Sequence, residues 1–350
     1  MKQHNDKIFS INDPTAQKLT VDDVLLTPSI GVLDSRSKAV INPGYIFSSP
    51  MDVVTGYDLS EVMLSQNQSP VFCRFISDAE RMRALNDFYK HENFWFSVGL
   101  NREDYDRLDK FFIDKPFDSK INISIDVAHG ATAIASRFYK LYKEAKWCRN
   151  LMSGTVATRQ AALYVAEYCS HIRVGIGPGS ACSTRVVTGC GYPNLAAVYE
   201  ISSALEAKSL NNFIIADGGI RSSGDIIKYL AAGAHGVMLG SMLSSLQESH
   251  GWIEPFIGRP YKYYRGQASK EFQIHRRGKI NGTPEGVQST KKIYKTVSFV
   301  DFNYQIKSAI ASAISYLGIN CIKDLNPHNV KFVRITTSGL QESHPHILLK

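Results

Sequence analysis

Residues 174–198 read VGIGPGSACSTRVVTGCGYPNLAAV, which places a glycine-rich turn and a cysteine within one short stretch. Gly175, Gly177 and Gly179 allow consecutive backbone N–H groups to point at one anion. Cys182 follows them directly and is a candidate nucleophile. The stretch therefore predicts covalent chemistry on a phosphorylated ligand.

Length and composition are those of an ordinary globular protein. The chain has 350 residues, enough for two domains or one β/α barrel, with 44% hydrophobic and 21% charged residues. No apolar run approaches the roughly 18 residues that would span a bilayer. The first residues carry no apolar leader, so we expect a cytoplasmic protein without a membrane partner. The 6 cysteines are irregularly spaced with no CxxC pair, which argues against a disulfide framework and a zinc site.

The net charge of +8 raises the question of a nucleic-acid partner. Lysine and arginine are scattered along the chain, except for a basic segment at residues 259–295. A phosphate-bearing small molecule explains that segment at least as well as a nucleic acid does. We therefore expect no nucleic acid among the partners.

Apolar or β-branched runs alternate with helical patterns, as in an α/β protein of the (β/α)8 TIM-barrel class. The expected strands are residues 45–51, 70–76, 94–100, 121–127, 150–156, 172–177, 213–217 and 236–240. The expected helices are residues 59–66, 78–89, 131–146, 158–168, 194–207, 224–232 and 302–317. Asp126, Cys182, Asp217 and Gly240 fall at or just beyond strand ends, where barrel enzymes place their chemistry.

A long insertion rich in glycine, lysine and arginine, at about residues 244–299, follows the last expected strand. It is too polar for a core, so we expect a mobile flap over the site. The chain is expected to form a single domain over residues 1–350, with a C-terminal tail at about residues 331–350.

The pattern Gly-x-Gly-x-Gly-Ser-x-Cys-x-Thr at residues 175–184 resembles the active-site loop of the IMP dehydrogenase and GMP reductase family. LTVDDVLLTP at 19–28, SPMDVVT at 49–55 and GLQESHPH at 339–346 extend the resemblance over nearly the whole chain. It implies an enzyme that attacks C2 of a purine nucleoside monophosphate with a thiolate and transfers hydride with NADPH or NAD. It also implies a homo-oligomer, a tetramer. The family's dehydrogenases usually carry a regulatory module after the second strand, but residues 76–94 leave room for only one helix.

The resemblance assigns roles to individual residues. Cys182 would be the nucleophile, and Thr184 with Glu285 of the TPEG sequence would handle ammonia or water at C2. The cofactor residues would be Asp126, His129 and Gly130 of the IDVAHG sequence. The substrate would be held by Asp217 on the ribose and by phosphate-binding turns; the full set is Ser180, Asp217, Gly218, Gly219, Gly240, Ser241, Gln267 and Ser269.

The tail resembles that of bacterial dehydrogenases, which implies a potassium ion bound by backbone carbonyls between subunits. The metal set would be Gly177, Gly179 and Cys182 of one subunit with Glu342, Ser343 and His344 of a neighbouring one. The alternative interpretation of this tail is a disordered terminus.

The direction of the reaction depends on the flap. The family's dehydrogenases activate water with an adjacent Arg-Tyr pair, and HRRGKINGTPEG at residues 275–286 contains none. With the IDVAHG strand and the missing regulatory module, this favours a GMP reductase that converts GMP to IMP and ammonia with NADPH. YRGQAS at 264–269 and the tail favour instead an IMP dehydrogenase that oxidises IMP to XMP with NAD, in which Arg276 or Arg277 would serve as half of the pair.

A third alternative is a non-redox barrel, such as a phosphosugar lyase or a nucleotide-binding protein without turnover. Glycine turns after strands seven and eight are the generic phosphate site of β/α barrels, so phosphate binding does not depend on the family. Such a protein would tolerate Cys182→Ala.

Three positions depart from the family pattern. Arg74, after Cys73, stands where the family has a lysine and cannot lose a proton as lysine can. Thr155 replaces the usual asparagine near the nicotinamide. Gln267 stands where a small residue or methionine lines the base, and its amide can both donate and accept hydrogen bonds, so the base need not be plain guanine.

Overall fold

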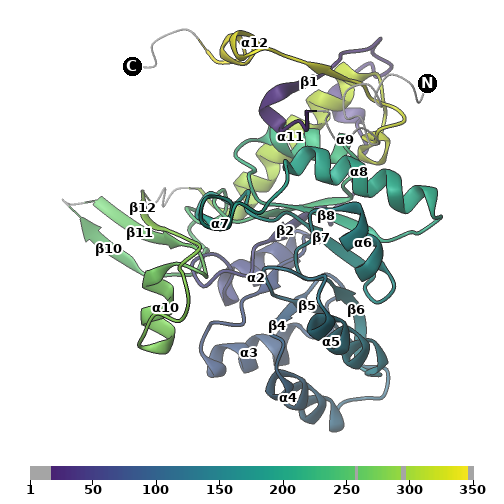
Figure 1. Ribbon diagram of the computed structural model, residues 1–350. Helices are drawn as coiled ribbons and strands as arrows, with labels where there is room; N and C mark the ends of the chain where they lie inside the picture. Colours follow the sequence, from purple (N-terminus) through teal and green to yellow (C-terminus); the bar gives the residue numbers. More distant parts are fainter. Residues whose placement is uncertain (1–16, 257–258, 293–296, 346–350) are drawn as a thin grey trace.

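The computed structural model describes residues 17–256, 259–292 and 297–345. Its barrel strands are β2 (Ile46–Ser48), β3 (Val71–Phe72), β4 (Trp95–Val98), β5 (Ile121–Ile125), β6 (Cys148–Met152), β7 (His171–Val174), β8 (Phe213–Asp217) and β9 (Gly236–Leu239). They form an 8-stranded sheet of parallel pairs in the order β2-β9-β8-β7-β6-β5-β4-β3 (Figure 1). Ser69, just before β3, donates its N–H to Ile46 of β2 at 2.9 Å and accepts from Ser48 at 3.2 Å. These bonds bring the two ends of the sheet together, so the expected (β/α)8 TIM barrel is confirmed.

Helices follow the strands on the outside of the ring (Figure 1). They are α2 (Tyr57–Ser65), α3 (Asp78–Phe88), α4 (Arg102–Ile113), α5 (Ala133–Glu144), α6 (Arg159–Ala166), α8 (Asn194–Ala207), α9 (Ser223–Ala231) and α11 (Phe299–Leu317). Three more described helices lie elsewhere: α7 (Thr184–Thr188) in the loop after β7, α10 (Lys270–Arg277) in the insertion and α12 (Thr337–Glu342) in the tail. All seven expected helices are present. The expected list lacked α4, although Asn101 caps it by accepting from the N–H of Asp104. Between β3 and β4 the chain forms only α3, as the sequence predicted.

The core has two layers because successive strand residues face opposite sides of the sheet. Phe47, Val71 and Trp95 belong to a small cluster with Met152, Ile215 and Met238, which fills the barrel interior. Their strand neighbours Ile46 and Phe72 belong to the larger cluster between sheet and helices.

The insertion after β9 is folded. In its described part, β10 (Ile253–Phe256), β11 (Arg259–Arg265) and β12 (Gln288–Lys292) form an antiparallel sheet, and α10 lies beside it (Figure 1). Tyr264 and Phe272 are buried, the latter against Phe75 with ring centroids 4.9 Å apart. The expectation that the insertion is too polar to be core is therefore wrong at Tyr264 and Phe272, whose rings are buried. Its mobility stays a prediction.

The tail also takes part in the fold. Strand β13 (Phe332–Arg334) pairs antiparallel with β1 (Val24–Leu26), and the short helix α12 follows it. The disordered-terminus interpretation is therefore wrong for residues 331–345, and residues 346–350 lie outside the described part of the chain.

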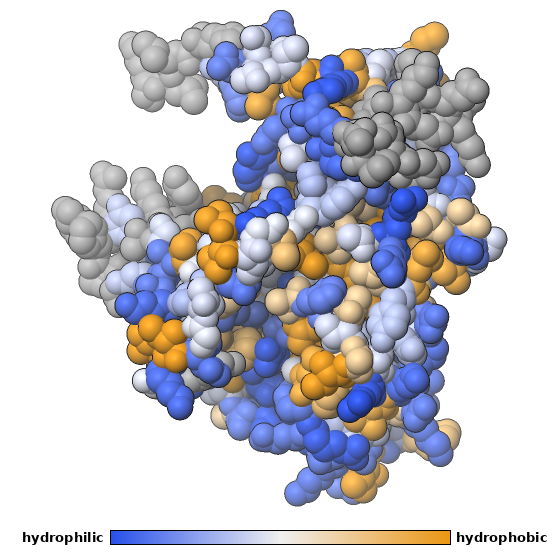
Figure 2. All heavy atoms as spheres, in the orientation of Figure 1, coloured by the Kyte–Doolittle hydropathy of each residue, from blue (hydrophilic) through white to orange (hydrophobic). Residues whose placement is uncertain are grey.

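The visible face of the molecule is mainly hydrophilic, with scattered apolar groups (Figure 2). Among the described helices, none combines the length and the apolar character needed to cross a bilayer.

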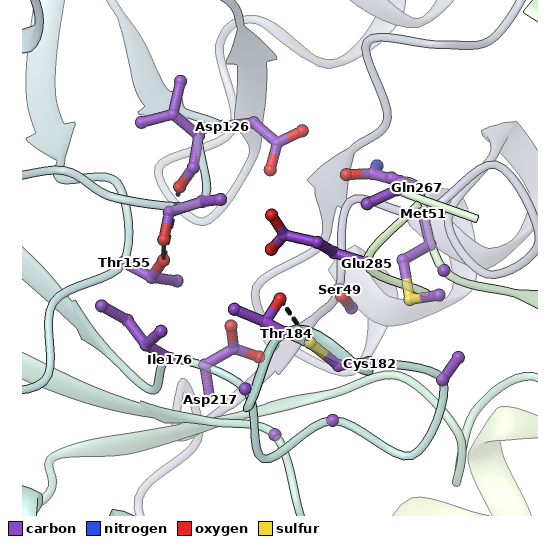
Figure 3. A pocket seen from close by; sticks show the side chains of 18 of the residues that line it. Ser49, Met51, Asp126, Thr155, Ile176, Cys182, Thr184, Asp217, Gln267 and Glu285 are labelled. Atoms are coloured by element: carbon purple, nitrogen blue, oxygen red, sulfur yellow. Dashed lines mark hydrogen bonds between the residues drawn. The ribbon is translucent and has the colours of Figure 1, made fainter. Parts of the chain in front are cut away.

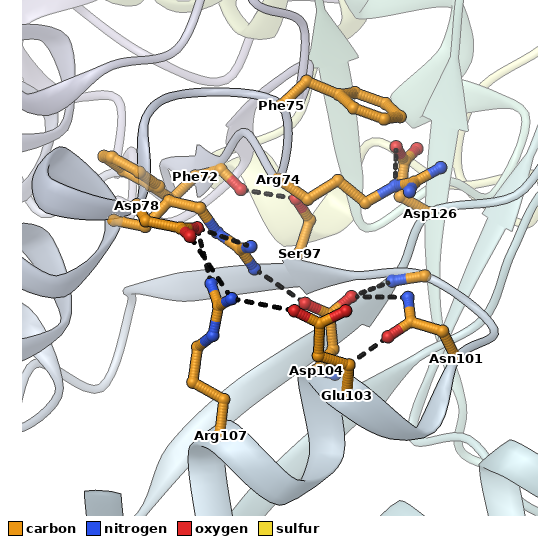
Figure 4. A network of polar contacts seen from close by, with 12 residues as sticks. Phe72, Arg74, Phe75, Asp78, Ser97, Asn101, Glu103, Asp104, Arg107 and Asp126 are labelled. Carbon is orange, nitrogen blue, oxygen red and sulfur yellow. Dashed lines mark hydrogen bonds and ion pairs between the residues drawn. The ribbon is translucent and has the colours of Figure 1, made fainter. Parts of the chain in front are cut away.

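A buried ion pair joins two outer helices (Figure 4). Arg81 of α3 lies 3.1 Å from Asp104 of α4, and both side chains are largely buried. Asp104 also accepts from the N–H of Gly99 at 2.9 Å and from Nδ2 of Asn101 at 3.0 Å. Burial alone would raise the pKa of Asp104, but the Gly99 hydrogen bond, the charge of Arg81 and the Asn101 amide together lower it.

We predict that Arg81→Met lowers the free energy of unfolding at pH 7 by about 3 kcal/mol, because it leaves the Asp104 carboxylate buried without its cation. A carboxyl group with a lowered pKa stabilises the fold above its unfolded-state pKa of about 3.9, and this stabilisation is lost as the pH falls through the lowered value. The difference between wild type and variant should therefore shrink below pH 4. Denaturant titration of wild type and variant at pH 7 and below pH 4 measures this difference in the free energy of unfolding.

Arg83→Met on the same helix is the matched control, because Arg83 and Asp87 form an exposed pair at 3.9 Å. It should change stability by less than about 1 kcal/mol. Equal effects of the two variants at pH 7 would contradict this account of the ion pair.

Candidate active site

A cavity of about 560 Å³ opens at the carboxyl ends of the barrel strands (Figure 3). The loops after β2, β3, β5, β6, β7 and β8 contribute to it, because the carboxyl ends of parallel strands meet at one face. Its lining includes Ser49, Arg74, Asp126, Thr155, Cys182 and Asp217 from the barrel, and Tyr264, Gln267, Phe272 and Glu285 from the insertion. The structure thus brings together most of the site residues that the sequence predicted.

The loop that carries the predicted nucleophile Cys182, residues 175–183, is called the nucleophile loop. It follows β7 and approaches the end of β8 very closely. Gly175 has a φ of +152°, and a Cβ atom there would lie 2.0 Å from the backbone oxygen of Asp217. A side chain at this position is therefore excluded. The Cys182 N–H donates to the Gly179 carbonyl at 2.9 Å, which folds the loop back so that Cys182 lines the cavity.

Cys182 lies beside a hydroxyl group. Its Sγ is 3.2 Å from Oγ1 of Thr184, at the start of α7 (Figure 3). Cys182 is exposed, whereas Cys148 and Cys169 lie apart from the cavity, and burial raises the pKa of the Cys148 thiol to about 12. Burial likewise raises the pKa of Cys169 well above its usual range. Cys182 is therefore the accessible thiol of this cavity.

Backbone hydrogen bonds tie the insertion to the nucleophile loop. Ser183 donates to the carbonyl of Glu285 at 2.9 Å, and Val287 donates to the carbonyl of Ala181 at 3.0 Å. On its other side, Glu285 donates to the carbonyl of Ala268 at 3.0 Å. The Glu285 segment is thus held between residues 181–183 and Ala268. Figure 3 shows the Glu285 carboxylate directed into the cavity near Thr184.

Arg173 lies on β7 beneath the cavity and bridges two of the predicted carboxylates. Its Nε is 2.7 Å from Asp217, and its Nη1 is 3.2 Å from Asp126. Burial alone would lower the pKa of Arg173, but the charges of Asp217 and Asp126 outweigh it and raise the pKa. Arg74 adds a second cation to Asp126, at 3.1 Å.

Next to the main cavity lies a smaller one of about 300 Å³, lined by the predicted phosphate turns. Its lining includes Ser180, Gly218, Gly219, Gly240 and Ser241, together with Thr20, Arg221 and Tyr264. Gly218 and Gly219 have φ values of +86° and +74°, a conformation that favours glycine. Asp217 and Gly179 line both cavities, so one ligand can occupy the two.

The predicted cofactor residues are placed differently from one another. Asp126 lines the main cavity, with Val127, Ala128 and Thr155 beside it. His129 is exposed and Gly130 is buried, and neither lines the cavity. A Cβ atom at Gly130 would lie 2.6 Å from the Gly154 carbonyl oxygen, so close packing explains that glycine. The cofactor role of His129 and Gly130 stays a prediction.

The two predicted substrate residues of the insertion, Gln267 and Ser269, also differ in whether they line the main cavity. Gln267 lines the main cavity, and its Nε2 donates to the carbonyl of Pro50. Ser269 is fully buried and caps α10 by accepting from the N–H of Phe272. Contact of Ser269 with a ligand stays a prediction.

The predicted metal residues lie in two places. Gly177, Gly179 and Cys182 belong to the nucleophile loop. Glu342, Ser343 and His344 lie at the end of α12, and Figure 1 shows α12 at the top of the molecule, apart from α7 at mid-height. Within one chain the two sets do not meet, so a shared potassium ion needs the neighbouring subunit and stays a prediction.

The sequence prediction missed Arg173 and gave Tyr264 no role of its own. The signal for Arg173 was a charged residue inside an apolar strand, which is rarely tolerated without partners. Tyr264 lies in the quoted YRGQAS sequence, and its hydroxyl is 3.5 Å from Oγ of Ser180.

Comparisons with known proteins agree with this geometry. Residues 18–346 match the model of the IMP dehydrogenase / GMP reductase domain. The chain is 42% identical over 234 residues to an inosine-5'-monophosphate dehydrogenase of Staphylococcus saprophyticus, covering 63% of this chain and 46% of that protein. It is 40% identical over 235 residues to the same enzyme of Halalkalibacterium halodurans, covering 64% and 47%. The match thus spans about half the length of these relatives.

The matched region contains the nucleophile loop, the paired carboxylates and the glycine turns that line the two cavities. The chain belongs to the IMP dehydrogenase / GMP reductase family.

Proposed function

We propose that this protein is an oxidoreductase that acts at C2 of a purine nucleoside monophosphate through a covalent bond to Cys182. The observation that carries the proposal is the position of the exposed Cys182 thiol, 3.2 Å from Thr184 and between an anion-binding pocket and the Glu285 carboxylate. Family membership supports it. We also propose that the nucleotide is its small-molecule partner. The protein would form a homo-oligomer and would be located in the cytoplasm.

The two joined cavities suit a nucleotide. Backbone N–H groups of the turns after β8 and β9 would bind the phosphate, as unpaired amides at strand ends do in other barrels. One carboxylate oxygen of Asp217 is held by Arg173, and the other has no recorded partner among the described residues, so it is available to a ribose hydroxyl. The base then extends past Cys182 toward the insertion.

The Cys182 thiol would first lose its proton into the cavity. The resulting thiolate would then attack C2 of the base. Thr184 and Glu285 are placed to orient and deprotonate the water, or to protonate the ammonia, that reacts at the same carbon. A nicotinamide dinucleotide would accept or supply the hydride when bound. The part of the cavity beyond Cys182, lined by Asp126 and Thr155 with the Phe75 and Phe272 rings nearby, is apolar on one side and suits such a ring.

The comparisons favour the oxidative direction, because the relatives are named IMP dehydrogenases. We therefore place oxidation of IMP to XMP with NAD ahead of reduction of GMP with NADPH. The flap keeps the reductive direction as a second candidate, since it lacks an Arg-Tyr pair and places Glu285 beside Thr184. The proposal of IMP oxidation includes a potassium ion bound between subunits.

The first test is absorbance at 340 nm in two mixtures, one with IMP, NAD and potassium and one with GMP and NADPH. We expect a rise in the first mixture. A fall in the second, with ammonia released, would reverse the direction and support the reductase. No change in either mixture would contradict the proposal of an oxidoreductase acting on these nucleotides.

The second test is Cys182→Ser. We expect turnover to fall by a factor of about 10³ or more, because the nucleophile is lost, while nucleotide binding is retained. Cys190→Ser is the matched control, since Cys190 is exposed near the same loop but does not line the cavity. Steady-state kinetics with calorimetric binding separates the two effects, and full turnover in Cys182→Ser would contradict a covalent role for Cys182.

A further inference from the structure

We propose that Gln267 makes the base pocket selective for purines that present two N–H groups on their N1–C2 edge. Guanine has two such groups, N1–H and the C2 amino group; hypoxanthine and xanthine have one, N1–H, and adenine has none. The inference rests on the proposed function, because it assumes a purine nucleotide with C2 near Cys182, and it narrows the class of bases that the site prefers.

The orientation of the Gln267 amide is fixed by the barrel. Its Nε2 donates to the carbonyl of Pro50, in the loop after β2. That loop is held in place, since Ser49 donates to the carbonyl of Leu239 at 2.9 Å and Met51 to that of Ser49 at 2.7 Å. An amide whose nitrogen faces a carbonyl must place its oxygen elsewhere, so the assignment of Oε1 and Nε2 follows from the contact.

The oxygen of Gln267 is available to a ligand. Figure 3 shows it on the side of the amide nearer to Glu285, and Gln267 lines the main cavity. Within the described residues, no hydrogen bond to Oε1 of Gln267 is recorded. Gln267 therefore presents an acceptor to the cavity.

Glu285 presents a second acceptor from the adjacent segment. Its backbone N–H donates to the carbonyl of Ala268, the residue after Gln267, so the two side chains start from adjacent segments of the insertion. Its carboxylate lines the same cavity and has no ion pair among the described residues. An ionised carboxylate only accepts hydrogen bonds. Gln267 and Glu285 therefore form one wall of the pocket, which presents two hydrogen-bond acceptors.

The wall faces the reacting edge of the base. Figure 3 shows Asp217 and Gln267 on opposite sides of the cavity, with Cys182 and Glu285 between them. A nucleotide whose ribose lies at Asp217 therefore directs the edge of its base past Cys182 toward Glu285 and Gln267. Buried acceptors left without a donor cost binding affinity, so bases with fewer N–H groups on this edge bind more weakly.

The test is titration calorimetry with GMP, XMP, IMP and AMP in the absence of any dinucleotide, so that no turnover occurs. We expect GMP to bind wild type about tenfold more tightly than IMP and XMP, which have one N–H group on this edge, and AMP to bind more weakly still. In Gln267→Met the ratio of GMP to IMP affinity should approach one.

Gln247→Met is the control, because Gln247 is exposed and lies outside both cavities. An unchanged GMP to IMP ratio in Gln267→Met would overturn the inference while leaving the proposed function intact. If no purine nucleotide binds wild type, the proposed function fails as well, and the two failures are distinguishable.

Discussion

A single buried cation organises the site. Arg173 lines the cavity and holds Asp217 on one side and Asp126 on the other, so it fixes the side chains at the carboxyl ends of β8 and β5. A buried cation needs such partners, and each carboxylate in turn needs the cation. Because Asp217 and Asp126 are the residues proposed to contact substrate and cofactor, the same cation holds both proposed binding groups in place.

The second constraint is the contact between the insertion and the nucleophile loop. The Glu285 segment lies between Ala181–Ser183 on one side and Ala268 on the other, bound to both through backbone hydrogen bonds. Backbone bonds do not depend on side-chain identity, so the side chains of Gln267 and Glu285 can vary without loss of the arrangement. This explains how a position such as Gln267 can change the chemistry of the base pocket while the frame of the site stays the same.

Much of the barrel was predictable, because its strands are short apolar runs between helices with clear caps. The cysteine loop and both phosphate turns were predictable because glycine is required where φ is positive or chains approach closely, as at Gly175 and Gly218. The bridging role of Arg173 was not, since it joins residues 47 and 44 positions away in sequence. The packing of the insertion was missed for a related reason, because its polar composition hid the few aromatic residues that anchor it.

The most direct test of the account is a covalent bond between nucleotide and Cys182 during turnover. Trypsin separates the two cysteines of this region, since it cleaves after Arg173 and Arg185, which isolates residues 174–185 from Cys190. Mass spectrometry of a reaction quenched with acid should find a nucleotide adduct on the peptide 174–185 alone. A turning-over enzyme with no adduct there, or with one on the Cys190 peptide, would contradict the central claim.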